Sequence, residues 1–244
     1  MSDFFADSDW KGLSDVIETD TEFIPLISPE DEDRMNLEEV PDKLPILPLR
    51  NNVLFPGVVI PITLGRDKSI KLIQDAYKGN KIIGVVSQKD SNIEEPLYAD
   101  LFKIGTVAQI IRMLKMPDGS STIIIQGKKR LKLVEELATD PYIVAKIEEF
   151  EEKRLKKMSK ESLALFDSLK DLALNIIKNS PNIPSEAAFA IKNIESPNFL
   201  VNFISSHMNA EVDEKQKMLQ EPDIHLRAQL LMKHLNKELQ MLEL

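Results

Sequence analysis

The spacing of apolar residues changes once along this chain, near residue 150, and this change most constrains the fold. From Leu44 to about Phe150, short β-branched runs alternate with turn signals, as in an all-β barrel or sandwich. Beyond residue 160, one apolar stripe follows the 3.6-residue period of a helix, formed by Leu165, Phe166, Leu169, Leu172, Ala173, Ile176 and Ile177. We therefore predict an α+β fold, with a β-rich domain over residues 44–152 and a helical domain over residues 153–244.

Turn residues divide the β-rich domain into candidate strands. These strands span residues 44–49, 58–64, 81–88, 105–116, 121–126, 131–136 and 141–150. The segment Met116–Ser120 separates two of them, and it contains Pro117, which presets a negative φ, and Gly119, which accepts a positive φ. We therefore predict a hairpin at this segment.

One helix interrupts the strands, and further helices make up the second domain. In the first helix Asp67 is the expected cap, and Gly79 stands where a left-handed terminating residue belongs. Ser196 before Pro197 predicts another helix start, and Asp223 predicts the start of a long final helix. The apolar residues of that helix recur every three or four positions up to the end of the chain, so we expect it to continue in a longer protein.

Acidic residues are concentrated in the first 43 residues. This segment holds 14 Asp and Glu against 3 Lys and Arg, a net charge of −11, whereas the other 201 residues carry +2. Because it shows no sustained period and contains Pro25, Pro29 and Pro41, we predict that residues 1–43 form a mostly disordered tail. A nearly neutral body argues against a protein that binds nucleic acid by neutralising many phosphates.

The composition is typical of a protein that works in a reducing compartment. The chain has no cysteine, which excludes disulfides, thiolate metal sites and a cysteine nucleophile. Its acidic start differs from a secretory or transit peptide, and it has no run of about 18 apolar residues that could span a membrane. We therefore expect a cytoplasmic location and no membrane partner.

No motif for a cofactor or for catalysis can be recognised. The chain has only 8 glycines, and it contains neither a phosphate-binding loop nor a dinucleotide fingerprint. His207, His225 and His234 lack the spacing of zinc ligands, so we interpret them as surface or interface residues. We expect no catalytic residue, no metal and no cofactor in this chain.

Two short basic segments are the candidates for nucleic-acid binding, residues 128–132 and residues 153–157. Neither segment contains interleaved aromatic residues on which bases could stack. We favour a solvated basic face over a phosphate-binding one, so DNA stays open as a partner without being indicated.

Several ordered motifs resemble the Lon protease family. They are the runs LPLRNNVLFP at 47–56, Ile60-Pro61, GRDKSI at 65–70, VVSQKD at 85–90, LFKIGTVA at 101–108, MLKMPDG at 113–119 and DEKQK at 213–217. The resemblance covers about residues 44–244 and is specific because several motifs occur in order. The acidic extension has no counterpart in the shortest members of the family.

The resemblance implies a PUA-like β pseudo-barrel joined to a helical bundle whose last long helix leads into an ATPase module. In the full-length family, an AAA+ module uses ATP and Mg, and a protease module carries a serine-lysine dyad; neither lies in this chain. Such proteins are cytoplasmic or organellar homohexamers that degrade misfolded, tagged and regulatory proteins. The resemblance therefore implies that this region captures unfolded or tagged substrates and helps to arrange the ring, with a weak dimer of the isolated region left open.

Two groups of residues are the candidate substrate-binding sites. The first is the hairpin tip with Met113, Leu114 and Met116, because flexible, polarizable methionines suit a promiscuous apolar surface. Packing of these residues onto the helical bundle is the alternative. The second group stands at the start of the first helix and consists of Arg66, Asp67, Lys68 and Lys71. A capped, solvated helix terminus is the alternative for this group.

A second function class remains open, namely a free-standing ligand- or nucleic-acid-binding module that uses the β domain alone. This alternative predicts a marked pocket or basic groove and a steep loss of nucleic-acid binding with salt. The open-ended final helix argues against it.

Overall fold

The computed structural model describes residues 26–153, 158–180 and 185–243. It divides the chain into two compact units. The β unit comprises residues 32–151, and the helical unit comprises the described residues from Glu152 onward together with those before Glu32. Strands in the first unit and helices in the second confirm the predicted α+β class.

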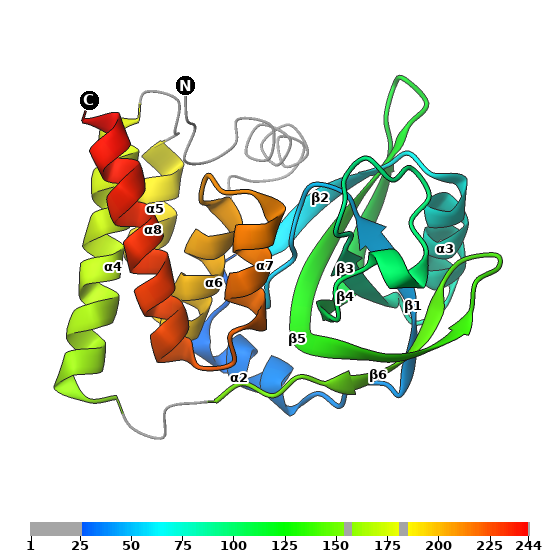
Figure 1. The fold of residues 1–244 in the computed structure, drawn as a ribbon, viewed down its shortest axis with the longest axis horizontal. Helices are drawn as coiled ribbons and strands as arrows, with labels where there is room; N and C mark the ends of the chain where they lie inside the picture. The colour runs from blue at the N-terminus through cyan, green and yellow to red at the C-terminus, as the bar shows by residue number, and fades with distance from the viewer. Residues whose placement is uncertain (1–25, 154–157, 181–184, 244) are drawn as a thin grey trace. The chain divides into compact units, whose positions relative to one another are not determined.

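The β unit is built on one six-stranded sheet with the order β2-β5-β4-β3-β1-β6 (Figure 1). Its strands are β1 (Lys43–Leu49), β2 (Val59–Leu64), β3 (Ile82–Ser87), β4 (Ile104–Lys115), β5 (Ser121–Ala138) and β6 (Val144–Glu149). An additional pairing of β5 with β6 closes five of the strands into a barrel. Only β1 and β3 pair in parallel; the other pairings are antiparallel.

β5 is one long strand, which corrects the prediction of two strands over residues 121–126 and 131–136. At Gly127 a Cβ would lie only 2.2 Å from the carbonyl oxygen of Phe55, so glycine here permits a close approach of two backbones. Gly127 also donates to the carbonyl of Val58 at 2.9 Å. The glycine therefore marks a close approach of two backbones within a continuous strand and not a break between two strands.

The core of the β unit is apolar and lies inside the barrel. One cluster of buried side chains is contributed by β1, β3, β4, β5, β6 and the loops beside them: Leu44, Ile46, Val86, Leu101, Val107, Leu131, Leu133, Ile143, Ala145 and Ile147. Val40, which precedes β1, packs against this cluster. The alternation of buried and exposed residues along β6 matches a strand with one face on the core.

Helix α2 (Pro29–Leu37) and the start of β1 lie within the segment for which the sequence predicts disorder. Ser28 explains the helix, because its Oγ accepts from the backbone N–H of Asp31 at 3.1 Å and Pro29 follows it in the first turn. Met35 on this helix is only 5% exposed. The prediction of disorder is therefore wrong for residues 29–37 and 43, while residues 1–25 lie outside the described residues.

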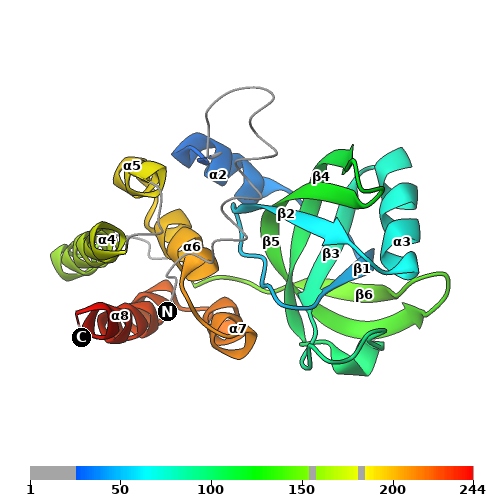
Figure 2. The ribbon, with the colours of Figure 1, turned by 90° about the horizontal axis from the view of Figure 1, so that it is seen from above.

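Helix α3 (Asp67–Lys78) lies against the sheet beside β1 (Figure 2). Arg66, and not Asp67, occupies the cap position, and Asp67 is the first helical residue, where its charge favours the helix N-terminus. Gly79 does not adopt a left-handed conformation; Lys81 does, with φ of 62°. The Lys81 ammonium lies 4.5 Å from the ring centre of Tyr77, a cation–π contact that accompanies this unusual backbone.

The helical unit contains α4 (Lys160–Asn179), α5 (Ser185–Asn193), α6 (Pro197–His207), α7 (Val212–Gln220) and α8 (Ile224–Leu242). Helix α8 packs against α4 and α6. The predicted caps are confirmed: Ser196 accepts from the N–H of Phe199, and Asp223 accepts from those of His225 and Leu226. Helices α5 and α7 were not predicted as separate helices.

None of the helices in the described residues is long and apolar enough to cross a membrane. The same part of the chain contains no group of three or more His, Cys, Asp or Glu residues that could hold a metal ion.

Candidate functional site

The hairpin between β4 and β5 ends in a turn that is fixed by its own hydrogen bonds. Met116 donates from its backbone N–H to the carbonyl of Ser120 at 2.9 Å, and Gly119 adopts a φ of 87°. The hydroxyl and the backbone N–H of Ser120 both donate to Asp118 Oδ1, and these bonds lower the pKa of Asp118. The predicted turn is therefore confirmed, and it projects from the end of the sheet (Figure 1).

Apolar side chains at the end of this hairpin remain accessible. Ile111 is 48% exposed and Met116 is 36% exposed, while Met113 and Leu114 are partly buried. Because neighbouring residues of a strand alternate between faces, Met113 and Leu114 point to opposite sides of the hairpin. Ile111 was not predicted as a site residue, because its place in an apolar strand gave no sign that it would be exposed.

At the start of α3 the four predicted residues have different surroundings. Arg66 is partly buried, and its Nη2 donates to Oε1 of Gln88 at 2.6 Å. Lys68 lies 3.5 Å from an Asp140 oxygen. Lys71 lies 2.9 Å from Asp75 Oδ1, and this bond raises the pKa of Lys71 and lowers that of Asp75.

A cavity of about 70 Å³ separates the start of α3 from the loops that follow β3 and β5. Arg66 and Lys68 line it, whereas Asp67 and Lys71 do not. Its walls are mostly apolar and are formed by Ile46, Pro48, Ser69, Leu72, Glu95, Pro96, Leu97, Glu136, Thr139, Tyr142 and Ile143, in addition to these two cations. The structure therefore divides the second predicted group into two cavity residues and two surface residues.

The register of the sheet brings the two predicted groups to one end of the β unit. Leu64 at the end of β2 pairs with Ser121, which also pairs with Lys115 at the end of β4. Neighbouring strands lie about 5 Å apart and two residues of chain reach about 7 Å, so the Cα atoms of Arg66 and Lys115 lie within roughly 20 Å. An extended segment of about six residues is long enough to contact both groups.

The basic segment 128–132 is paired with carboxylates in the structure. Lys128 lies 3.4 Å from Glu38, Lys129 lies 3.1 Å from Glu149, and Lys132 lies 3.4 Å from Glu148. Arg130 is buried, and its guanidinium lies 5.1 Å from the ring centre of Phe150. These ion pairs argue against a phosphate-binding face, but only Lys132 fits the predicted solvated face, because the side chains of Lys128 and Lys129 are mostly buried. Of the other basic segment, residues 154–157 lie outside the described residues.

Residues 43–237 match the family model described as the ATP-dependent protease La (LON) substrate-binding domain. The chain belongs to the Lon substrate-binding domain family. A Lon protease of Flavobacterium johnsoniae is 58% identical over 227 residues, which cover 93% of this chain and 28% of that protein. A Lon protease of Cytophaga hutchinsonii is 50% identical over 223 residues, covering 91% of this chain and 27% of that protein. The chain thus spans little more than a quarter of the length of these relatives.

Solved structures share the fold of this Lon domain. The N-terminal domain of a Mycobacterium avium complex Lon protease superposes with a TM-score of 0.66 at 18% identity, covering 80% of this chain and 98% of that one. A Lon N-terminal domain protein from Xanthomonas campestris superposes with a TM-score of 0.57, covering 78% of this chain and 97% of that one. The predicted resemblance to the Lon family is confirmed.

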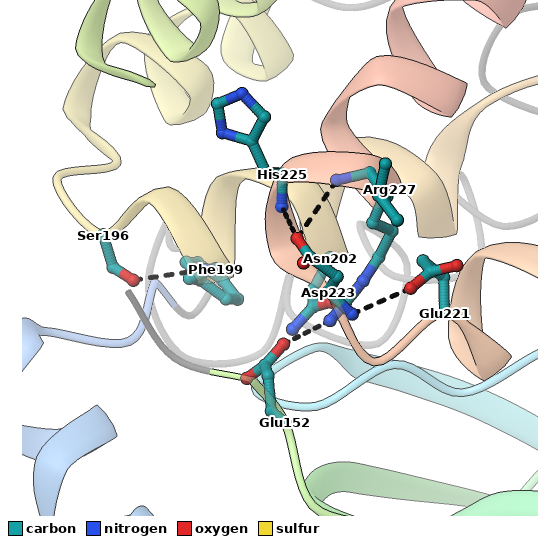
Figure 3. Close-up of polar contacts among 9 residues, drawn as sticks. Glu152, Ser196, Phe199, Asn202, Glu221, Asp223, His225 and Arg227 are labelled. Atoms are coloured by element: carbon teal, nitrogen blue, oxygen red, sulfur yellow. Dashed lines mark hydrogen bonds and ion pairs between the residues drawn. The ribbon is translucent and has the colours of Figure 1, made fainter. Parts of the chain in front are cut away.

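A buried arginine in the helical unit of the Lon domain escaped the sequence analysis (Figure 3). Arg227 on α8 has no exposed surface; its Nη1 donates to Oδ1 of Asn202 on α6 at 2.7 Å, and its Nη2 donates to Oε1 of Glu152. The next residue, Lys153, donates from its backbone N–H to the carbonyl of Pro222 at 2.9 Å. These bonds attach residues 152 and 153 to the start of α8.

The three histidines, which were predicted as surface or interface residues, are all partly buried. His207 is partly buried, and its Nδ1 donates to the carbonyl of Phe203 at 2.8 Å while its ring lies 4.4 Å from the Phe203 ring centre. Burial lowers the pKa of His207 to about 4, with Lys215 adding a smaller effect in the same direction. His225 lies 3.4 Å from Ser162, and His234 lies 3.0 Å from the carbonyl of Asn209. Each ring thus has a local packing or hydrogen-bonding partner.

Proposed function

We propose that this Lon domain captures unfolded or tagged protein chains through apolar surface at the hairpin end of its β unit. The observation that carries the proposal is the exposure of Ile111 and Met116 on a hairpin whose turn is held by its own hydrogen bonds. Unfolded chains expose apolar side chains without a fixed order, so their receptor needs accessible apolar surface with modest specificity. Met113, Leu114 and Met116 supply such a surface, and Arg66 and Lys68 extend it toward the cavity.

Binding at one domain is expected to be weak. Burying one apolar side chain contributes about 1.5 to 3 kcal/mol, and association costs several kcal/mol of lost freedom. A site with a few such anchors therefore binds no better than micromolar, which suits a receptor that must hand its substrate on.

In the whole protein we place this domain before an AAA+ module that uses ATP and Mg, and a protease module with a serine-lysine dyad. In this proposal the protein is a cytoplasmic homohexamer that degrades misfolded, tagged and regulatory proteins, and this region helps to arrange the ring. The support is the match to Lon proteases over about a quarter of their length. The chain itself binds and does not cleave.

The alternative is a free-standing ligand- or nucleic-acid-binding module. The carboxylates beside Lys128, Lys129 and Lys132 reduce the attraction of this face for phosphates. Binding of single-stranded DNA that falls steeply with salt, together with no binding of unfolded protein, is the result that favours the alternative.

The test of the proposed function changes Met113 and Met116 to serine and measures binding of a labelled, permanently unfolded protein by fluorescence anisotropy. We expect about a tenfold loss of affinity with an unchanged melting temperature, because both residues lie at the accessible end of the hairpin. Val134→Ser is the matched control, since Val134 is an exposed apolar residue farther along β5. Unchanged binding by a folded hairpin variant contradicts the proposal, and so does an equal loss in the control; a collapse of stability shows that the methionines are core residues.

A further inference from the structure

The cavity beside α3 has mostly apolar walls and one cation, Arg66, that does not use all of its hydrogen-bond donors. Arg66 makes one side-chain hydrogen bond in the described part of the chain, to the neutral amide oxygen of Gln88. Gln88 is itself fixed, because its Nε2 donates to the carbonyls of Asp90 at 2.6 Å and Ile93 at 2.9 Å. A guanidinium has five N–H donors, so Arg66 keeps donors for a ligand while Gln88 holds its orientation.

The surroundings of Arg66 favour an added negative charge. Burial and the like charge of Arg50 both lower the pKa of Arg66, and the attraction of Glu95 opposes them with a smaller effect. Lys68 at the same cavity and Lys71 on the same helix differ, because each already lies within 4 Å of an aspartate. Among the cations at the start of α3, Arg66 is thus the one that an incoming carboxylate stabilises most.

The ligand must carry more than a negative charge. Glu95 and Glu136 also line the cavity, so a matching ligand presents a hydrogen-bond donor beside its carboxylate. The volume of about 70 Å³ suits one apolar side chain between Leu72 and Ile143. In the interior of an extended peptide, an acidic and an apolar side chain on neighbouring residues point to opposite faces. The two side chains therefore cannot easily enter one small cavity together. The last residue of a chain carries a carboxylate, an N–H and a side chain on a single carbon atom.

We propose that this cavity binds the C-terminal residue of an unfolded polypeptide, with its apolar side chain in the cavity and its α-carboxylate on Arg66. The proposal deepens the proposed function and depends on it, because it names the part of a substrate that the β unit recognises. Residues that precede the terminus then extend toward the hairpin, which lies within reach of a short segment.

The test compares three short fluorescein-labelled peptides of one unstructured sequence by fluorescence anisotropy with the whole chain. The first ends in leucine with a free carboxylate, the second ends in leucine carboxamide, and the third ends in serine with a free carboxylate. We expect the first to bind about tenfold more tightly than either of the others, because each of these lacks one of the two recognised groups. Equal affinities of the free acid and the carboxamide overturn the proposal.

Variants test whether Arg66 causes the preference for the free acid over the carboxamide. Arg66→Gln is expected to remove the difference in affinity between acid and carboxamide, and Arg66→Lys retains only part of this difference. Lys78→Gln is the matched control, since it removes a cation from the last turn of the same helix, away from the cavity. An acid preference that survives in Arg66→Gln overturns the assignment to Arg66. The peptide comparison itself needs no variant, so a folding defect does not remove the test.

A long unfolded protein with an amidated C-terminus separates the two proposals. If it binds through the hairpin while the free acid and the carboxamide peptides bind equally, the terminal-residue proposal fails and the proposed function stands. If neither the unfolded protein nor any peptide binds, both fail.

Discussion

Arg227 shows that the helical unit buries a charged group of a type that is usually exposed. Arg227 lies between Ile224 and Leu231 on the buried face of α8, where its charge needs a carboxylate, and Glu152 supplies one. The spacing could have indicated that Arg227 is buried, because it lies three positions after Ile224 and four before Leu231, on the apolar stripe of the helix. Its partner could not be found by spacing, since Glu152 lies 75 positions away along the chain.

His207 predicts a pH dependence of stability. Its pKa in the folded chain is about 4, below the value of 6.5 for an unperturbed histidine, so the unfolded state binds the proton more readily. The stability due to the neutral ring is therefore complete above pH 6.5 and is lost as the pH falls toward 4. Between pH 7 and pH 5 we expect the free energy of unfolding of the helical unit to fall by roughly 2 kcal/mol from this group.

Urea denaturation at the two pH values measures this loss, and His207→Asn is the informative variant. Asparagine retains a donor that can reach the carbonyl of Phe203 but does not titrate, so the pH-dependent part of the loss should disappear. A variant with the same pH dependence as the original chain contradicts the assignment to His207.

Helix α2 belongs to the folded structure although it lies in an acidic segment. The signal for it is Ser28 followed by Pro29, the same pair of residue types that starts α6 at Ser196 and Pro197. Net charge and proline content predicted disorder because they average over the segment, whereas a cap acts on one residue. Four acidic residues follow within the first turns, where the positive end of the helix dipole stabilises them.

Truncation of Met35 tests how much α2 contributes to the stability of the fold. Met35→Ala is expected to lower the free energy of unfolding by about 2 to 3 kcal/mol, because truncation of a buried side chain leaves a cavity. Leu37→Ala on the same helix is the control: Leu37 is 83% exposed, so its loss should cost less than about 0.5 kcal/mol. Equal and small effects of the two variants would mean that α2 contributes little to stability.

Elements with a strong period were predicted well, and elements set by distant contacts were not. The caps of α6 and α8 and the turn after β4 depend on a few neighbouring residues, so the sequence contains their whole cause. At Gly127 in β5, the backbone is approached closely by that of Phe55, which lies far away in the sequence. The cavity likewise joins α3 to residues near 95 and 140, and no local pattern could have predicted it.

At the scale of the molecule, weak sites become useful through repetition. The hairpin and the cavity both lie in the β unit, so under the proposed function one chain offers a substrate one cluster of weak contacts. The ring proposed for the whole protein brings several such clusters together. Tethered copies raise the effective concentration of the next site, and this raises affinity by about a hundredfold or more when one ligand reaches two sites.

Fusing the chain to a hexamer-forming scaffold through flexible linkers tests the effect of repetition without the modules that we propose for the whole protein. We expect the apparent affinity for a long unfolded protein to rise by about a hundredfold, because such a chain spans several sites. A short peptide occupies one site only, so its affinity per site should be the same for the fusion and for the single chain. Both are measured by anisotropy at equal concentrations of domain. An equal gain for the short peptide would mean that the scaffold changes the site itself, and no gain for the long chain would mean that the sites act alone.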